Sequence, residues 1–589
     1  TLGGEYYFNL RKTWTSNDQW MFSQTPGNPY SNQDGNAKGL YGERQGRTYN
    51  LNKELTLNYN HTFFHDHNID ILLGASEQFG RWNVTDLNGN VNYSDFQFRS
   101  IGNVPPYTNG FAGILQEDAL IGYVGRLSYK FKDKYYVDGT LRHDGSSRLA
   151  PGHKWDNFAS FAAAWRISAE DFFPKTRFIN DIKVRGGWGK LGNYQSAAYY
   201  AFLSNVSLTP DYPLGSGNGD GYGTQLQGAA LPNFANTTLT WEKLRTTSIG
   251  IDATLFDNQL SFTAEYYNKT TYDIIQSVSL PPNTGIEGAA DLNIGKVRNR
   301  GFEFRLGYNT NLGPVGFNAS ANLTTVNNKV IRLYGGTPLG GELNRIEEGY
   351  SMFYLWGYKT GGVFQNQAEI DAWRQKYADV NIGQNPDNPA VGYVYKPGDM
   401  YFSDVYGNPK DNSERYNKSP DGIVNGNDRT YLGKTIPGYY YGLNLGANYK
   451  GIDISIFFQG VGDVQKYNGV RSGLESMSGL ANQWATTLDR WTADNPSTSI
   501  PRAVYADPAA ALRISDRFVE NAAYFRLKNL QLGYTFPKDM TNWLGFMQNL
   551  RIYVAAINLA TITKYSGLDP ENDLIPPTRQ VQFGINASF

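Results

Sequence analysis

The sequence has 589 residues, with 53 Lys and Arg against 54 Asp and Glu, five His and no Cys. The balanced charge leaves no basic excess to neutralise phosphates, so nucleic acid is not expected as a main partner. The absence of Cys excludes disulfides, thiolate metal sites and Cys nucleophiles. The 42 Tyr, 32 Phe and 64 Gly residues favour an all-β chain. A membrane helix would need roughly 18 or more consecutive apolar residues, and the apolar runs of this chain are far shorter.

The N-terminus has no charged start followed by an apolar stretch, so no signal peptide is expected. A strand-like run, Glu5 to Leu10, follows almost directly after Thr1. We therefore expect this sequence to be a piece of a longer protein.

Apolar residues alternate with polar ones through most of the chain, which is the period of a β-strand. The pattern is clearest at the end, where Val581, Phe583 and Ile585 alternate with Gln580, Gln582 and Gly584. Many patterns run about ten residues, longer than the mean globular strand of about 5–6 residues and similar to a tilted membrane strand. A soluble β-sandwich or propeller is the alternative. We predict sixteen strands, near 4–10, 48–63, 68–83, 118–131, 134–144, 155–167, 181–192, 242–256, 259–276, 292–310, 315–330, 436–449, 451–463, 523–536, 549–560 and 578–589.

The predicted connections alternate between short and long. Tight turns fall at 64–67, 132–133, 257–258 and 450, and long loops at 11–47, 84–117, 193–241, 331–435 and 464–522. Outer-membrane barrels have short periplasmic turns and long external loops. The order of connections therefore predicts a transmembrane antiparallel β-barrel with long extracellular loops. Its first strand would run outward, and Phe589 would lie in the periplasm.

The strand count leaves two sizes of barrel open. Six further strands would give twenty-two, the size of plugged outer-membrane transporters, whereas sixteen strands fit a porin. A loop as long as 331–435 favours the transporter. Two loop segments, 367–378 and 480–491, are expected to be helical.

Aromatic residues gather where these loops begin and in the loops themselves. Tyr439, Tyr440 and Tyr441 lie at an outer strand end, and Trp356, Trp484 and Trp491 lie in the two longest loops. These six residues are the candidates for substrate binding. Their rings could instead form the interfacial girdle or pack inside the loops.

Several segments in the chain resemble one family. They are Arg142-His143-Asp144-Gly145-Ser146-Ser147-Arg148, Ala164-Trp165-Arg166-Ile167-Ser168, Gly189-Lys190-Leu191-Gly192-Asn193, Leu239-Thr240-Trp241-Glu242, Tyr267-Asn268-Lys269-Thr270-Thr271, the run 293–303, Tyr524-Phe525-Arg526-Leu527-Lys528-Asn529, and the run 565–571. Together these segments, spread over 140–589, resemble the SusC-like TonB-dependent receptors of Bacteroidota.

The resemblance implies a twenty-two-stranded barrel in the outer membrane of a Gram-negative bacterium, closed by an N-terminal plug. Residues 1–589 would then be its C-terminal part, without the plug and about six strands. It also implies a SusD-like lipoprotein lid, energy supplied by TonB through the plug, and dimers of the pair. The expected function is active import of an oligomeric nutrient, a glycan or a peptide. A siderophore-type receptor and a passive porin are the alternatives.

An acidic loop could hold calcium, since Asp404, Asp421, Asn425 and Asp428 correspond to a near-continuous acidic and Gly-rich loop in that family. About sixteen residues separate Asp404 from Asp421 in this chain, and an ordinary turn built by Asx side chains is the alternative. His65-Asp66-His67 is expected to be a turn and not a metal site. The sequence has neither a Gly-x-Ser-x-Gly elbow nor a phosphate-binding loop, so we do not expect an enzyme.

Overall fold

The computed structural model describes residues 2–15, 39–91, 110–174, 176–204, 206, 211–214, 224–231, 234–278, 283, 289–379, 393–407, 419–538, 540, 547–572 and 575–588. Seventeen strands among them belong to one antiparallel sheet. The chain divides into two compact units, 1–163 with 188–245 and 272–294, and 164–187 with 246–271 and 295–589. None of the helices in these described ranges has the length and apolar character needed to cross a bilayer.

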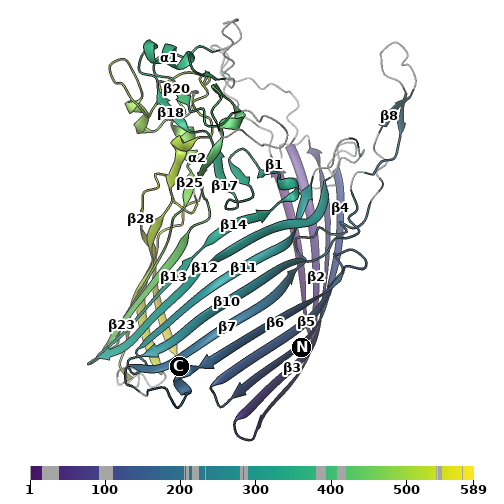
Figure 1. Ribbon diagram of the computed structural model, residues 1–589, viewed down its shortest axis with the longest axis vertical. Helices are drawn as coiled ribbons and strands as arrows, with labels where there is room; N and C mark the ends of the chain where they lie inside the picture. Colours follow the sequence, from purple (N-terminus) through teal and green to yellow (C-terminus); the bar gives the residue numbers. More distant parts are fainter. Residues whose placement is uncertain are drawn as a thin grey trace. The chain divides into compact units, whose positions relative to one another are not determined.

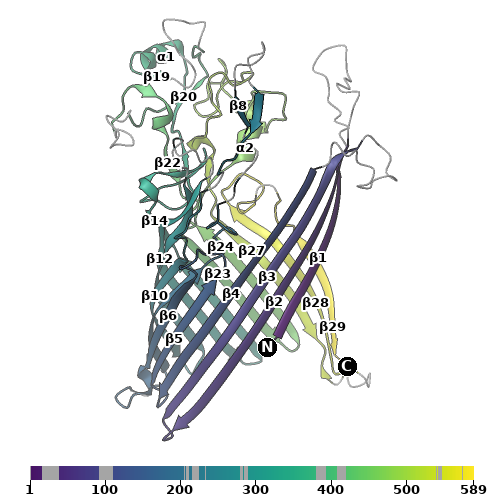
Figure 2. The same ribbon diagram turned by 90° about the vertical axis from the view of Figure 1, so that its right-hand side faces the viewer.

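The first unit contains long strands paired in chain order (Figures 1 and 2). They are β1 (Leu2–Thr15), β2 (Gly39–Phe63), β3 (His67–Val91), β4 (Gly110–Phe131) and β5 (Tyr135–Ser146). The pairing of β2 with β3 continues to Gly39 and Val91. The predicted ends at 48 and 83 were therefore wrong, because the backbone ladder continues where the apolar alternation has stopped.

Four further strands, β6 (Trp155–Arg166), β7 (Ile179–Asn193), β10 (Glu242–Leu255) and β11 (Leu260–Val278), have residues in both units. The tight turn after β10 contains Asp257 and Asn258, with φ of 54° and 66°. The turn after β4 contains Lys132 and Asp133, with φ of 51° and 55°. Positive φ at both central residues is typical of the turn type that joins adjacent antiparallel strands. These two predicted turns are confirmed.

The second unit carries the rest of the sheet. Its strands are β12 (Ala290–Leu312), which begins in the first unit, β13 (Val315–Thr325), β14 (Asn327–Arg332), β23 (Tyr439–Tyr449), β24 (Ile452–Gly462), β27 (Tyr524–Thr535), β28 (Asn549–Thr563) and β29 (Gln580–Ser588). From β12 to β29 they pair antiparallel in chain order, with β14 also on β12.

The structure divides the single strand predicted at 315–330 into β13 and β14. The backbone N–H of Val326, between them, donates to the carbonyl of Gly438 at 2.7 Å. Opposite this point β12 has Gly301, where a Cβ would collide with the carbonyl of Thr325. The interruption therefore depends on close packing that the alternation of one strand cannot show.

The apolar rows of the sheet are exposed. Leu55 and Leu57 on β2 are 75% and 66% exposed, and Phe583 on β29 is 84% exposed. A β-sandwich would bury such rows against a second sheet. The opposite face carries ion pairs, such as Arg126 with Asp70 at 3.1 Å and Arg551 with Asp453 at 2.6 Å. The sheet thus has the alternation of a membrane barrel, apolar toward lipid and polar toward the lumen.

The buried core of the second unit lies in its loops and not in its sheet. We call this region the cap. Its core residues are Tyr358, Val363, Phe364, Ile370, Trp373, Tyr395, Met400, Phe402, Val424, Ala509 and Ala511. The cap includes α1 (Gln367–Arg374), β18 (Thr360–Val363) and β20 (Met400–Phe402), which gather beyond the strand ends opposite the tight turns (Figure 1).

Two helices had been predicted for these loops. The first forms as α1, where Asn366 accepts from the backbone N–H of Glu369, but it ends at Arg374 and not at the predicted 378. The second, 480–491, was wrong in extent, since only a 3-10 helix, η10 (Ala485–Asp489), forms there. A short helix not foreseen from the sequence, α2 (Gly469–Leu474), precedes it.

Candidate functional site

The tyrosine triplet at the start of β23 divides between the two faces of the sheet, because successive strand residues alternate. Tyr440 shares its face with Asn444 and Asn448. Tyr441 lies on the apolar face, where its ring stacks on that of Phe525 with the centroids 6.2 Å apart. Its hydroxyl donates to the carbonyl of Tyr524 at 3.0 Å. Only Tyr440 of the triplet therefore belongs to the polar, lumenal face.

A cavity of about 500 Å³ opens beside Tyr440, where the strand ends meet the loops. We call it the mouth cavity. Its lining residues are Leu343, Asn344, Leu355, Thr435, Pro437, Tyr440, Val461, Val464, Gln465, Lys466, Tyr467, Ala522, Tyr524, Pro570 and Glu571. Leu355, Val464 and Ala522 are buried, whereas Asn344, Tyr440 and Glu571 are exposed at its rim.

The two charged side chains that line the mouth cavity contact other protein groups. The amine of Lys466 donates to the carbonyl of Pro570 at 3.1 Å. The carboxylate of Glu571 accepts from the hydroxyl of Tyr524 at 2.6 Å and also pairs with Arg526, which is 1% exposed. The charges therefore hold the walls together across loops that are far apart in sequence.

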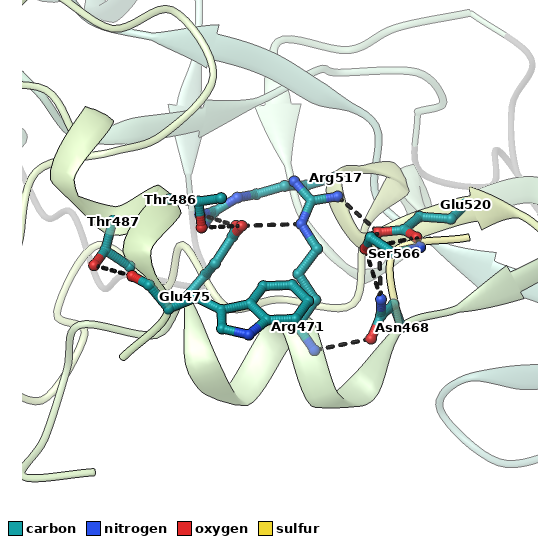
Figure 3. Close-up of polar contacts among 9 residues, drawn as sticks. Asn468, Arg471, Glu475, Thr486, Thr487, Arg517, Glu520 and Ser566 are labelled. Atoms are coloured by element: carbon teal, nitrogen blue, oxygen red, sulfur yellow. Dashed lines mark hydrogen bonds and ion pairs between the residues drawn. The ribbon is translucent and has the colours of Figure 1, made fainter. Parts of the chain in front are cut away.

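A polar network fixes the loops that form one wall (Figure 3). Glu475, which is 1% exposed, accepts from Arg471 at 3.0 Å and from Arg517 at 3.2 Å. Arg471 also pairs with Glu520 at 3.0 Å, and Ser566 donates to Glu520 from its N–H and its hydroxyl. The network thus joins α2, the segment around 517–520 and the loop at 566.

The contacts within this network shift the pKa values of two of its charged groups, Glu520 and Arg517. Burial alone would raise the pKa of Glu520, but hydrogen bonds from Ser566 and Arg471 outweigh burial and lower it. Burial lowers the pKa of Arg517 despite the attraction of Glu475. Glu520 is therefore held as a carboxylate at neutral pH. The network supports the pairing of β25 (Gln465–Tyr467) with β26 (Val519–Asn521), which carries Gln465 and Lys466 to the cavity.

The predicted tryptophans lie elsewhere. Trp356 is buried under the guanidinium of Arg345, whose Cζ lies 3.9 Å from the ring centroid. Trp491 packs against the cap core and donates from Nε1 to Gln365 at 3.2 Å. Trp484 precedes η10 and is partly exposed. The structure therefore brings only Tyr440, of the six candidates, to the mouth cavity.

Sequence reasoning missed most of the cavity. Asn344, Val461 and Ala522 carry no local signal that separates them from other loop and strand residues. Tyr524 and Glu571 did have a signal, because both belong to the segments that resemble the SusC-like family. Their contact at 2.6 Å explains how two distant segments form one site.

The acidic loop uses most of its side chains to bind its own backbone. Asp428 accepts from the N–H groups of Val405, Tyr406 and Asn425 at 2.7–3.0 Å. Asp404 accepts from Gly422 at 2.7 Å through Oδ2, and its Oδ1 is buried without a hydrogen-bond partner in the described structure. Burial, together with the charge of Asp404, raises the pKa of Asp428.

Neither the remaining residues of the acidic loop nor the His65-Asp66-His67 turn forms a cluster of metal ligands. Asp421 and Asn425 accept from Ile423 and Asn427, the pattern of an Asx turn. In the His65-Asp66-His67 turn, Nδ1 of His67 lies 2.7 Å from the hydroxyl of Tyr129. Within the described ranges, no three His, Cys, Asp or Glu residues converge as metal ligands would.

Comparison with known proteins gives consistent relatives. The chain is 28% identical over 603 residues to TonB-dependent receptor P26 of Formosa agariphila, covering 97% of this chain and 56% of that protein. It is 25% identical over 583 residues to TonB-dependent receptor SusC of Bacteroides thetaiotaomicron, covering 97% and 51%. The chain thus spans about half the length of these curated relatives.

A solved structure shares the fold of this chain. The RagAB peptide transporter matches with a TM-score of 0.77 at 22% identity, covering 100% of this chain and 60% of that one. The model of the TonB-dependent receptor-like β-barrel family matches residues 1–461. The family places the exposed apolar rows in the outer membrane. This chain belongs to the TonB-dependent receptor-like β-barrel family.

Proposed function

We propose that this chain forms the C-terminal barrel portion of a TonB-dependent importer for an oligomeric nutrient. The observation that carries the proposal is the mouth cavity, which lies on the polar face at the loop ends of a sheet whose other face is apolar. A site in this place would receive a solute from outside and release it toward the lumen.

The barrel would be completed by a plug and about six strands. The length of the curated relatives supports this, since the chain covers 49–56% of them. The plug would fill the lumen and contact TonB, and its presence would separate active import from passive flow through a porin.

The test uses the full-length gene in its native bacterium. Deletion should abolish growth on one class of oligomeric nutrient, and a protonophore should stop uptake in the complemented strain. Uptake that continues without the proton gradient would indicate a porin. Loss of growth under iron limitation alone would indicate a siderophore receptor.

We further propose a SusD-like lipoprotein as the lid over the cap. Support comes from the relationship to SusC and from apolar side chains exposed in one cap segment: Leu480, Leu488 and Tyr505 are 87%, 74% and 76% exposed. A hydrogen bond from the N–H of Ala506 to the carbonyl of Ser478 holds the two ends of this segment together. Exposed apolar groups of this kind favour a protein interface.

The lid proposal is tested by purifying the native complex. A SusD-like lipoprotein should copurify with the wild-type protein in a fixed ratio and be lost from Leu480→Glu/Leu488→Glu, with Asp489→Asn as the control. Native mass would show whether two pairs assemble together. Retention of the lipoprotein by the double variant would place the lid elsewhere.

We also propose a structural calcium ion in the acidic loop, with Asp404 Oδ1 as one ligand. The buried, unpartnered oxygen and the raised pKa of Asp428 support a cation between these carboxylates. Calcium should raise the unfolding temperature of the cap over that in EDTA, and Asp404→Asn should remove the difference. An equal unfolding temperature in calcium and EDTA would leave the Asx-turn explanation.

A further inference from the structure

The most buried residues that line the mouth cavity are mainly apolar, and its exposed lining residues include polar ones. Leu355, Val464 and Ala522, which we call the floor, are 2%, 7% and 4% exposed. The fourth buried lining residue, Tyr524, is 5% exposed and donates its hydroxyl to Glu571. The rim includes Asn344 and Glu571, whose side chains reach solvent. The most buried part of the lining therefore presents mainly apolar surface.

Several polar groups of the cavity walls already bind other protein groups. Lys466 donates to Pro570, and Gln465 accepts from the N–H of Lys434 at 3.2 Å. The hydroxyl of Tyr467 lies 3.1 Å from that of Ser472, and the hydroxyl of Tyr524 donates to Glu571. A deeply bound group would therefore find few hydrogen-bond partners below the rim.

This pattern distinguishes two classes of oligomer. A sugar unit carries hydroxyls around its ring, and each hydroxyl buried without a partner costs free energy. An apolar side chain loses nothing of this kind and gains from leaving water. Beside it, the main-chain amides of a peptide would remain at the rim, within the region of the Asn344 amide and the Glu571 carboxylate.

The size agrees with the chemistry. Ligand sites of about 300–1,000 Å³ are typical for small molecules, and the mouth cavity of about 500 Å³ accommodates a large side chain with room to spare. Tyr440, 39% exposed, lies at its edge, where a second ring could pack in an edge-to-face contact.

We propose that the mouth cavity binds a large apolar side chain of an extended peptide, so that the substrate class is peptide and not glycan. This inference rests on the proposed import function and specifies its substrate. Selectivity would come from the floor, and the rim would bind the peptide backbone without regard to sequence.

The test measures binding to the full-length protein, purified with its native partner in detergent. The probes are acetyl-Ala-Ala-Phe-Ala-Ala-amide, the same peptide with Ser for Phe, and maltohexaose. A preference of about ten-fold or more for the Phe peptide is expected, in the range that a hydrophobic pocket supplies. Val461→Trp should remove the preference by filling the cavity.

The matched control is Ile456→Trp, which adds the same indole to the opposite face of β24. It should keep the preference, so a general effect of the added ring is separated from loss of the cavity. Binding of maltohexaose alone, equal affinity for the two peptides, no binding of either, or an unchanged preference in Val461→Trp would each overturn the inference.

Growth of the deletion strain separates this inference from the importer proposal. If the gene is required for growth on an oligosaccharide and the peptides do not bind, import stands and the peptide assignment fails. If the gene is required for no oligomeric nutrient, the importer proposal itself fails, whatever the binding results.

Discussion

The sheet of the second unit, which we call the barrel wall, and the cap place their apolar side chains in opposite surroundings. On β29 the apolar side chains are exposed, with Phe583 at 84%, whereas in the cap Phe364 and Phe402 are at 1% and 0%. The wall is stabilised by its backbone ladder and by surrounding lipid, and the cap by a dry core. A Phe side chain therefore stabilises the cap by packing in its core. In the barrel wall it stabilises the protein by contacting the hydrocarbon of the bilayer.

The largest expected effect is in the cap core. The ring of Phe364 stacks on that of Tyr401 with the centroids 4.3 Å apart, and it makes an edge contact with the ring of Tyr395 at a centroid distance of 5.2 Å. Phe364→Ala should destabilise the cap by about 3–5 kcal/mol through lost burial and a cavity. Limited proteolysis should cut the cap, while the heat-dependent gel shift of the barrel stays unchanged. Leu488→Ala, at an exposed cap position, is the control; equal sensitivity of the two variants would mean that the cap has no independent core.

A slightly smaller effect is expected from the polar network. Glu475→Gln keeps the shape but leaves Arg471 and Arg517 without their shared carboxylate, a loss of about 3 kcal/mol for a buried pair. Hydrogen exchange should increase in α2 and around residue 517. Asp489→Asn, on the exposed side of η10, should change neither. Unchanged exchange in Glu475→Gln would mean that the network does not hold the cavity wall.

The stability of the barrel wall should depend on whether a charge is placed on its apolar face, and not on the loss of side-chain volume. Ile456 pairs in register with Leu445 and Leu530 on the apolar face of β24, and Ser455 lies on the other face. Ile456→Arg should cost about 2–4 kcal/mol near the middle of the bilayer and lower the yield of folded barrel. Ser455→Arg should fold normally. If both variants fold equally well, the assignment of faces in the wall is wrong.

The smallest effect is a pH dependence confined to the cap. The pKa of Glu520 is lowered in the folded state, so its stabilising contribution is complete above the ordinary pKa of about 4.3 and is lost as the pH falls through the lower folded value. The protection of the amides around residues 519–521 and 566 against hydrogen exchange, relative to the intrinsic rate at each pH, should decrease at pH below about 4 in the wild type. Glu520→Gln should already show the decrease at pH 7. A wild-type profile that does not change over this range would contradict the account of the network.

Sequence alone predicted the wall better than the cap. Alternation is a local signal, so fifteen of the sixteen predicted strands correspond to single strands in the structure, and the sixteenth corresponds to β13 and β14. Their exact ends were less predictable, because β2 and β3 keep pairing after the alternation fades. The break at Val326 also depends on a long-range contact with Gly438.

The mouth cavity shows why sites in the loops are harder to predict. Tyr440 was found as one of three adjacent tyrosines, but only the strand register separates it from Tyr439 and Tyr441. Asn344 and Glu571 lie more than 200 residues apart in sequence and meet at one cavity through tertiary structure. Phe589, expected in the periplasm, lies outside the described residues.

The central claim is that one face of the sheet contacts hydrocarbon and the other contacts water. Leu443 and Asn444 on β23 are adjacent residues on opposite faces, and this chain has no Cys to interfere with labelling. Spin labels at Leu443→Cys and Asn444→Cys in lipid vesicles would report the surroundings of each face directly. The account predicts relaxation by oxygen at position 443 and by a water-soluble nickel complex at 444; equal access of the nickel complex to both positions would contradict it.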